Sequence, residues 1–151
     1  MRVGIGYDSH RFADGRRLVL GGVEIPHDRG LSGHSDADVL THAVIDALLG
    51  AAGLGDLGTL FPPDEDRWRD AHSLDLLATA LGNLHGRVVN VDATLICEEP
   101  RVAGHRAEME RNIGQVLSAS VSVKASTNEG MGWVGRGEGI ACVAVALLEL
   151  D

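Results

Sequence analysis

The chain has 151 residues, of which 44% are hydrophobic and 3% aromatic, so we expect one domain spanning 1–151 whose single core is packed mainly by Val, Ile, Leu and Ala. Its formal net charge of −9 disfavours a nucleic-acid partner, because such a surface repels phosphate backbones. No basic and apolar leader is visible and no apolar run approaches the ~18 residues of a membrane span, so we expect a cytoplasmic protein outside the membrane.

Hydrophobic spacing and turn residues predict alternating strands and helices. The expected elements, in chain order, are a strand at 2–7, a hairpin at 18–25, a helix at 36–50, a long loop at 54–71, a helix at 73–84, a strand at 88–97, a helix at 100–117, a strand at 121–125, a Gly-rich turn at 130–139 and a strand at 140–150. Ser35 or Asp36 is the expected N-cap of the first helix. Gly50 or Gly53 is its expected end.

This order of elements predicts an α+β fold, with a mixed β-sheet and helices packed on one face. The near-continuous apolar run at the end of the chain is typical of a strand in the middle of that sheet. The two cysteines, Cys97 and Cys142, lie in apolar, strand-like runs. We therefore expect buried, reduced thiols rather than a disulfide or a nucleophile.

Asp8, His10 and His42 are the first candidates for chemistry. Residues i and i+2 of an extended segment point to the same side, so Asp8 and His10 can reach one ion. Two imidazoles and a carboxylate suit a divalent metal such as zinc, and three protein ligands leave a coordination position open, as in catalytic sites. The triplet Asp-x-His is a weak signal by itself. The residues alone also allow a second interpretation, in which the histidine lies by chance on a solvated polar face of a helix.

Asp38, His42 and Asp46 are spaced four apart and stack on one face of the expected helix. One interpretation is that the two acids orient His42 and fix its tautomer. The alternative is an ordinary polar face, with Asp46 in a salt bridge to a neighbour.

Two loops carry groups suited to phosphate. A phosphate at His34 and Ser35 can accept hydrogen bonds from the Ser35 hydroxyl and from the N-terminus of the following helix, and N-capping by Ser35 is compatible with that role. The hydroxyls and the carboxylate of segment 124–129 suit phosphate oxygens and a Mg²⁺ ion, although the same residues are common in plain turns. Trp68 and Trp133 lie in loop-like segments. Each is a candidate for a lid over the site or for a simple packing anchor.

Six segments together resemble one known family. They are, in chain order, Gly6-Tyr-Asp-Ser-His10, Leu20-Gly-Gly22, Gly33-His-Ser-Asp-Ala-Asp38 leading to His42, Asp56-Leu-Gly58, Phe61-Pro62 and Gly135-Arg-Gly-Glu-Gly-Ile140. In this order they are similar to the 2-C-methyl-D-erythritol 2,4-cyclodiphosphate synthase family, and the similarity covers essentially the whole chain. The resemblance implies a homotrimer of α/β subunits with active sites at the subunit boundaries.

The resemblance also implies a metal-dependent phosphorus–oxygen lyase of the non-mevalonate route to isoprenoids. Enzymes of the family convert 4-diphosphocytidyl-2-C-methyl-D-erythritol 2-phosphate into 2-C-methyl-D-erythritol 2,4-cyclodiphosphate and CMP. The substrate's own 2-phosphate attacks the β-phosphorus, so no strong general base is required. This agrees with the lack of a Ser-His-Asp or Cys-His pattern in the sequence.

Residue roles follow from the same resemblance. The implied zinc ligands are Asp8, His10 and His42. Glu129 is the implied ligand of a second divalent cation, Mg²⁺ or Mn²⁺, and His34 and Thr127 are implied to stabilise the transition state. The implied substrate contacts are Ser35, Asp56, Gly58, Phe61, Asp64, Glu65, Pro100, Arg101, Val102, Ala103, Ser126, Thr127, Trp133 and Arg136. Segments 97–103 and 125–127 resemble a cytidine pocket that the neighbouring subunit supplies.

The loop at 62–73 departs from the pattern of the family. Pro63 stands in place of an acid, Arg69 in place of Lys and His72 in place of Asp. The side chains of segment 101–103 also differ from those of common members. A pocket that reads cytosine through backbone groups would tolerate that second difference.

Two other functions stay open beside the synthase. A metal-dependent phosphoesterase with a zinc-bound water would give a linear hydrolysis product and act on simple phosphate esters. A non-catalytic trimer would bind a metal or an isoprenoid without turnover. A central cavity on the threefold axis, near Arg136 and Glu138, is a further candidate site for an isoprenoid diphosphate.

Overall fold

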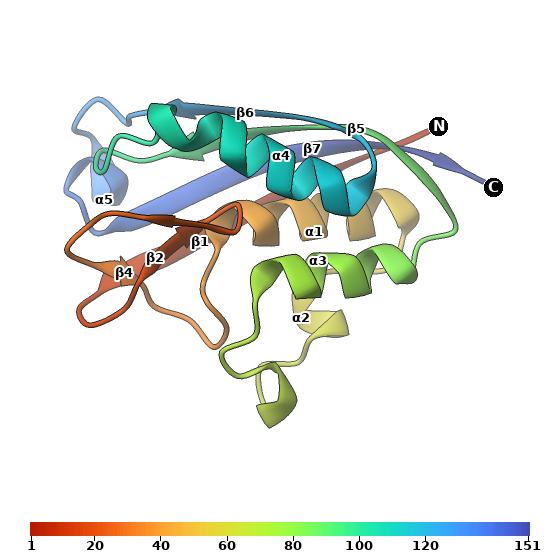
Figure 1. Cartoon of the computed structure of the whole chain (residues 1–151), viewed down its shortest axis with the longest axis horizontal. Coiled ribbons are helices and arrows are strands. Elements are labelled where there is room, and N and C mark those ends of the chain that lie inside the picture. Colours follow the sequence, from red (N-terminus) through yellow and green to blue (C-terminus); the bar gives the residue numbers. More distant parts are fainter.

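A mixed five-stranded sheet forms one layer of the molecule and the helices form the other (Figure 1). The computed structural model describes every residue from Met1 to Asp151. Its strands are β1 (Arg2–Ala13), β2 (Leu18–Leu20), β3 (Val23–Ile25), β4 (Gly30–Leu31), β5 (Gly86–Ile96), β6 (Ser120–Ser126) and β7 (Gly139–Leu150). Its helices are α1 (Val39–Ala52), α2 (Leu57–Leu60), α3 (Ser73–Gly82), α4 (Arg106–Leu117) and α5 (Gly132–Gly135), with 3-10 turns at Asp66–Trp68 and Ala103–His105. The predicted α+β class is confirmed.

The strand order of the large sheet is β4-β1-β7-β5-β6, and β2 and β3 form a separate hairpin. β5 and β6 run parallel, whereas β1 and β5 are both antiparallel to β7. The last strand, β7, therefore lies in the middle of the sheet as predicted, and most of its apolar side chains are buried. None of the helices is both long and apolar enough to pass through a bilayer.

The helix α1 lies directly on β1 and β7, because two glycines of β1 have no side chain. A Cβ atom at Gly4 would meet the carbonyl oxygen of Ala47, and one at Gly6 would meet that of Ala43. α3 packs against α1 and α4, and α4 packs against β6 (Figure 1). The buried hydrophobic residues between the sheet and this helical layer form one core cluster.

The opposite face of the sheet carries exposed apolar side chains. Val3, Ile5 and Tyr7 alternate along β1 with the two glycines that face α1. Val145 of β7 lies opposite Ile5 in the sheet register. Val3 and Ile5 are 68% and 71% exposed. A group of neighbouring apolar side chains on a sheet surface is a candidate contact for another protein.

The first strand is longer than predicted. The strand predicted at 2–7 continues through Asp8 and His10, because β7 pairs with β1 as far as Arg11. Asp8 and His10 therefore point to one side of a regular strand, opposite Cys142 and Ile140 in the register. The pairing fixes the spacing of the two side chains more firmly than a loop would.

The start of α1 also differs from the prediction. Its N-cap is Asp38 rather than Ser35 or Asp36. The Asp38 carboxylate accepts a hydrogen bond of 3.0 Å from the N–H of Thr41. Gly53, in the left-handed conformation with φ of 74°, ends the helix as predicted.

Short elements account for the remaining differences. The predicted helix at 100–117 begins at Arg106 after a 3-10 turn, so Pro100 lies outside it. The predicted loop at 54–71 contains α2, and the predicted turn at 130–139 contains α5. A helix of one turn has too few residues to produce a hydrophobic period, so the sequence pattern does not reveal it.

Candidate active site

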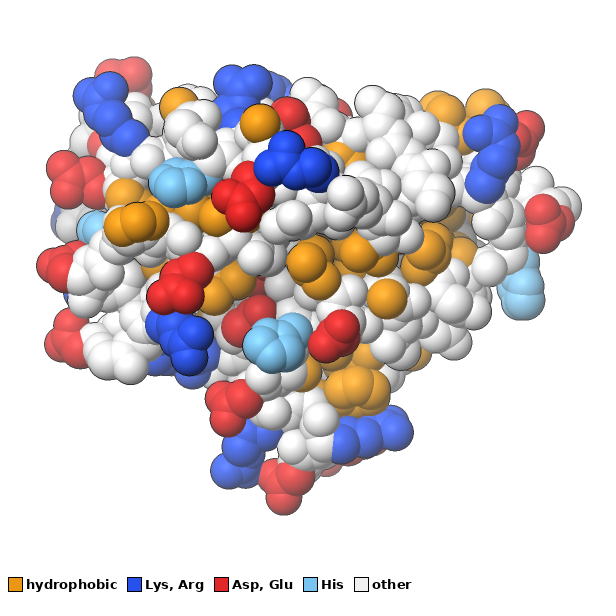
Figure 2. Space-filling view, viewed as in Figure 1, with side chains coloured by type: hydrophobic (Ala, Val, Ile, Leu, Met, Phe, Trp, Pro, Cys, Tyr) orange, Lys and Arg blue, Asp and Glu red, His pale blue; other side chains and the backbone are white.

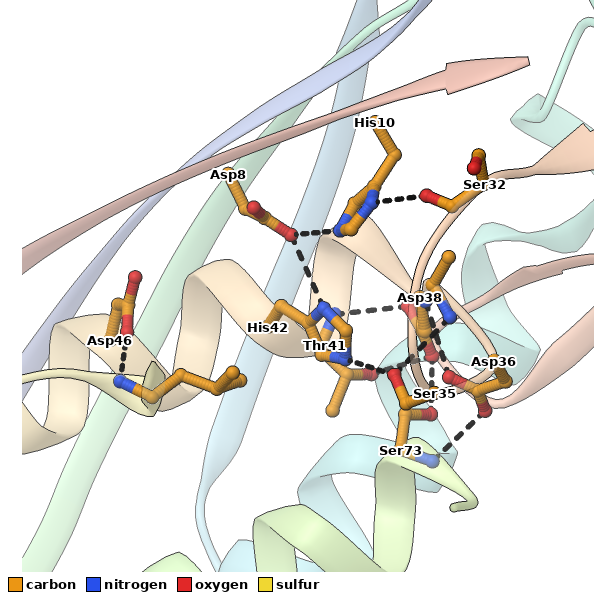
Figure 3. Close-up of polar contacts among 12 residues, drawn as sticks. Asp8, His10, Ser32, Ser35, Asp36, Asp38, Thr41, His42, Asp46 and Ser73 are labelled. Atoms are coloured by element: carbon orange, nitrogen blue, oxygen red, sulfur yellow. Dashed lines mark hydrogen bonds and ion pairs between the residues drawn. The ribbon is translucent and has the colours of Figure 1, made fainter. Parts of the chain in front are cut away.

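Asp8 and His10 on β1 and His42 on α1 point toward one another (Figure 3). Oδ2 of Asp8 lies 2.8 Å from Nε2 of His10 and 3.3 Å from Nδ1 of His42. The three candidate ligand atoms all lie within 4.8 Å of one another. Ligand atoms around a tetrahedral ion with bonds of ~2.0 Å are about 3.3 Å apart. This group can therefore hold a metal ion.

Each imidazole also makes a hydrogen bond that orients its ring. Nδ1 of His10 lies 2.7 Å from the carbonyl oxygen of Ser32. Nε2 of His42 lies 3.2 Å from the hydroxyl of Ser35. When Nδ1 of His10 donates to the carbonyl, its Nε2 lone pair faces Asp8 and is free for a metal. Such outer contacts are typical of metal-binding histidines, so the donor set fits a metal centre.

The electrostatics of the site favour charge on Asp8. Burial acts to raise the pKa of Asp8, but the hydrogen bonds and positive charges of His10 and His42 outweigh it and hold the pKa below its ordinary value. Burial acts to lower the pKa of His10, but the hydrogen bond and the negative charge of Asp8 raise it above the ordinary value. Asp8 and His10 thus each favour the charged form of the other.

The carboxylates of the two acids that share a helix face with His42 do not hydrogen-bond to its imidazole. Asp38 is fully buried and joins the hairpin, α1 and α3. Its donors are the N–H groups of Gly21, Gly22 and Thr41 and the hydroxyls of Thr41 and Ser73. Asp46 turns away from His42 and accepts 2.7 Å from the N–H of Leu57 (Figure 3). The predicted orienting contact therefore comes from Ser35, not from these acids.

A cavity of about 360 Å³ opens beside the metal ligands. The predicted site residues that line it are Asp8, His10, His34, Ser35, His42, Asp56, Gly58 and Phe61. The lining residues that the sequence did not assign to substrate are Asp46, Leu57, Pro63, Trp68 and Leu76. Leu57 and Leu76 are apolar residues with no polar group to offer a ligand, so the sequence does not separate them from ordinary core residues.

The loop after Phe61 forms one wall of this cavity. The ring of Trp68 meets that of Phe61 edge-to-face, with centroids 4.8 Å apart and planes at 85°. Trp68 is therefore a packing anchor of the loop and also a wall of the cavity. Asp56, which also lines the cavity, caps α2, and hydrogen bonds from Thr59 lower the pKa of its carboxyl.

Two predicted substrate residues of the same loop lie outside the cavity. Asp64 is exposed, and the Glu65 carboxylate lies 2.6 Å from Nε of Arg67. The backbone carbonyl of Glu65 instead lies 3.3 Å from Nε2 of His34. Pro63, which departs from the family pattern, lines the cavity in their place.

The remaining predicted site residues lie in the segments that follow β5 and β6. These segments are at the same end of the strands as Asp8, but β7 separates β5 from β1 in the sheet. The residues are Pro100, Arg101, Val102, Ala103, Ser126, Thr127, Glu129, Trp133 and Arg136, and none of them lines the cavity at the metal ligands. The segment after β5 and the turn after β6 meet where the N–H of Cys97 donates to the carbonyl of Ser126, 2.9 Å apart. One chain thus carries two separate groups of predicted site residues.

The turn after β6 is held by a glutamate that the sequence did not single out. Oε1 of Glu98 accepts hydrogen bonds from the N–H groups of Asn128 and Gly130, at 2.7 and 3.3 Å. Between them Glu129 has a φ of 53°, and its N–H lies 3.2 Å from the hydroxyl of Thr127. The carboxylate of Glu98 therefore fixes the turn that presents Thr127 and Glu129.

Fold and site together define an α+β enzyme in which three converging side chains are able to bind a metal ion beside a small-molecule cavity. The YgbB family model matches residues 1–149, and the chain belongs to this family. It is 57% identical over 155 residues to the 2-C-methyl-D-erythritol 2,4-cyclodiphosphate synthase of Syntrophomonas wolfei, a match that covers 99% of each chain.

Solved structures agree with this assignment. The bifunctional IspDF from Campylobacter jejuni matches 99% of the chain with a TM-score of 0.94 and 36% identity, and the chain spans 42% of that longer protein. IspF from Plasmodium falciparum, solved in complex with CDP, matches with a TM-score of 0.85 and 33% identity over 99% of this chain and 96% of its own.

Proposed function

We propose that this chain converts 4-diphosphocytidyl-2-C-methyl-D-erythritol 2-phosphate into 2-C-methyl-D-erythritol 2,4-cyclodiphosphate and CMP. One observation carries the proposal: Asp8, His10 and His42 converge beside a cavity that His34 and Ser35 also line. A relative at 57% identity carries the corresponding synthase name, which makes this the best-supported chemistry for the site.

The metal at Asp8, His10 and His42 is proposed to be zinc, because two imidazoles and one carboxylate suit that ion. When bound, it supplies a Lewis acid that polarises a phosphate oxygen. The chain itself contributes orientation: the Ser32 carbonyl and the Ser35 hydroxyl hold the two rings in place. Preorganised hydrogen-bond partners of this kind act without rearrangement during the reaction.

The reaction needs alignment more than proton transfer. An oxygen of the 2-phosphate forms the new bond to the β-phosphorus, and the bond from that phosphorus to the bridging oxygen breaks as CMP leaves with the electron pair. The nucleophile already carries negative charge, so no base has to activate it. His34 and Ser35 are proposed to hold the phosphate, and Asp56 and Gly58 the polyol, because all four line the cavity.

The second group of site residues is proposed to act across a subunit boundary. Thr127 and Glu129 are exposed in the isolated chain and do not line the cavity, so an active site with both groups needs a second copy. The exposed apolar face around Val3 and Ile5 supports such a contact, and we propose a homotrimer. Thr127 would then stabilise the transition state, and Glu129 would bind Mg²⁺ or Mn²⁺ beside the diphosphate.

The nucleotide and axial sites belong to the same proposal. The segment at 97–103 and the turn at 125–127 are joined by the hydrogen bond between Cys97 and Ser126. Apart from Cys97 and Val102 their residues are exposed or half-buried, which leaves them accessible to a cytidine group. The axial isoprenoid diphosphate site stays a prediction. In the isolated chain Nε of Arg136 lies 2.8 Å from the carboxylate of Glu138.

The test is incubation of the purified chain with the diphosphocytidyl substrate, zinc and Mg²⁺. We expect CMP by chromatography and a cyclic diphosphate by ³¹P NMR, and loss of both after metal chelation. A linear phosphate product would identify a phosphoesterase instead. Metal uptake without turnover would identify a binding protein.

A pair of histidine variants sharpens this test. His42→Ala removes a proposed ligand, so we expect at least ~100-fold less CMP release together with weaker metal binding. His85→Ala removes an exposed histidine that lies outside the cavity and should behave as the parent chain does. Equal activity of the two variants would contradict the proposed metal site.

A further inference from the structure

The loop between β4 and α1 carries His34 and Ser35, yet a residue from another part of the chain holds it. Arg16, in the turn that follows β1, reaches this loop with both terminal nitrogens of its guanidinium group. Nη1 donates 2.8 Å to the carbonyl oxygen of Gly33, and Nη2 donates 2.6 Å to that of Ser35. The two bonds bracket the peptide units of His34.

This contact is stronger and more directional than an ordinary loop contact. Hydrogen bonds from a charged donor are roughly twice as strong as neutral ones, and the planar fork of Arg fixes the separation of its two acceptors. A lysine has one point charge and no such fork. Arg16 is half-buried, so water competes less for these bonds than it does at the fully exposed Arg17 beside it.

The loop that Arg16 holds also reaches the metal ligands. The backbone carbonyl of Ser35 is bound by Arg16, while its hydroxyl lies 3.2 Å from Nε2 of His42. His34 lines the cavity from the neighbouring position. A shift of this short segment therefore moves the proposed phosphate contacts and the residue that orients a metal ligand at once.

Arg16 itself lies outside the active-site cavity. It lines a different, open groove of about 740 Å³ between the hairpin and the start of α3, together with Arg17, Asp36 and Ser73. Figure 2 shows acidic, basic and histidine side chains side by side on this helix-bearing face. Arg16 thus contacts the loop that carries His34 and Ser35 from the side of this groove and not from the active-site cavity. The groove is open, so a small cation can enter it.

We propose that Arg16 is a positioning residue for the reaction: its guanidinium clamps the carbonyls of Gly33 and Ser35 and thereby sets the places of His34 and Ser35 in the active site. The inference rests on the proposed function. Because Arg16 does not line the substrate cavity, its loss should act on turnover and leave substrate binding nearly unchanged.

The test compares Arg16→Ala, Arg16→Lys and the control Arg17→Ala. Arg17 is the matched control, since it is the neighbouring arginine and its contact is a loose 3.7 Å pair with Glu24 at the surface. CMP release is measured well below the melting temperature of every variant. For Arg16→Ala we expect kcat to fall about 100-fold with KM within about threefold, as for a small misplacement of reacting groups. Arg16→Lys should lie between this variant and the parent.

Chemical rescue separates positioning from a merely structural role. Millimolar guanidinium chloride should restore part of kcat in Arg16→Ala, because the ion can enter the groove and bind both carbonyls, whereas equal sodium chloride should not. Restoration by guanidinium alone supports the inference. Arg16→Ala with the kcat of Arg17→Ala, or a deficit that guanidinium leaves unchanged, overturns it. If Arg16→Ala does not fold, Arg16→Lys decides the question. A parental kcat in Arg16→Lys overturns the inference, and a reduced kcat in Arg16→Lys at parental stability supports it. An inactive parent chain would instead reject the proposed function.

Discussion

At the scale of single residues, the site depends on backbone atoms as much as on side chains. Ser32 contributes only its carbonyl to His10, and Arg16 binds only carbonyls. Such contacts leave no mark in the sequence, because any residue type can supply a carbonyl. The metal ligands were readable, since Asp-x-His on a strand predicts two side chains on one side, but the groups that orient them were not.

The cysteines give a prediction with a pH dependence. Burial, with the negative charge of Glu98 added, raises the pKa of Cys97 to about 11, and burial also raises that of Cys142. At pH 8 about one Cys97 thiol in a thousand is then a thiolate, far below the share of a free cysteine. We expect Ellman's reagent to react with both thiols orders of magnitude faster in urea than in the native protein. Rapid labelling of the folded chain would contradict this.

The same shift links thiol ionisation to stability. The folded state favours the neutral thiol, so its contribution is complete below the unfolded pKa of ~8.5 and is lost as the pH rises toward about 11. Urea midpoints measured at pH 8 and at pH 10.5 should therefore decrease with pH. Cys97→Ser removes one of the two groups and should make this decrease smaller.

Glu98 offers a test of the turn after β6. Glu98→Ala leaves the N–H groups of Asn128 and Gly130 without their acceptor, so the turn that presents Thr127 loosens. We expect CMP release to fall about tenfold. Glu98→Gln keeps a side-chain oxygen and should retain most activity. Glu108→Ala, at an exposed glutamate of α4 outside the predicted site, serves as the control. Parental activity in Glu98→Ala would contradict the role of Glu98 in holding the turn.

At the scale of elements, the long periodic segments were predictable and the short ones were not. The hydrophobic runs identified β5, β7, α1 and α3, because each buries a regular row of side chains. The start of α1 was missed, since Ser35, Asp36 and Asp38 are equally good caps by residue type. Tertiary contacts decide between them, because the carboxylate of Asp38 also accepts hydrogen bonds from the hairpin and from α3.

The contact between β1 and α1 can be tested at a single glycine. In Gly6→Ala the added methyl group would collide with the backbone of Ala43, so strand and helix must separate. We expect a loss of about 3 kcal/mol and a melting temperature lower by roughly 10 °C. The control is Gly82→Ala at the end of α3, where a Cβ meets nothing within 4 Å. That change should be neutral or slightly stabilising, and equal effects of the two would refute the close approach.

At the scale of the whole molecule, the apolar sheet face predicts assembly. Ile5 lies at the centre of this face, 71% exposed and opposite Val145. Ile5→Asp places a charge where a neighbouring chain would bury it, so we expect light scattering to show a monomer in place of a trimer. Leu54→Asp, at an apolar residue that is 42% exposed away from β1 and β7, should leave the trimer intact. A trimeric Ile5→Asp would place the interface elsewhere.

Shared active sites make a stronger prediction, because two inactive chains should restore each other. His42→Ala removes a metal ligand and Thr127→Ala a group of the second site cluster, and the structure places the two residues in separate parts of one chain. If each site takes His42 from one subunit and Thr127 from the next, every mixed trimer contains one intact site of its three. An equal mixture, unfolded and refolded together, then regains about a quarter of the parental activity. Each variant refolded alone should stay inactive. A mixture that stays inactive as well, although mixed trimers form, would mean that both groups act within one chain.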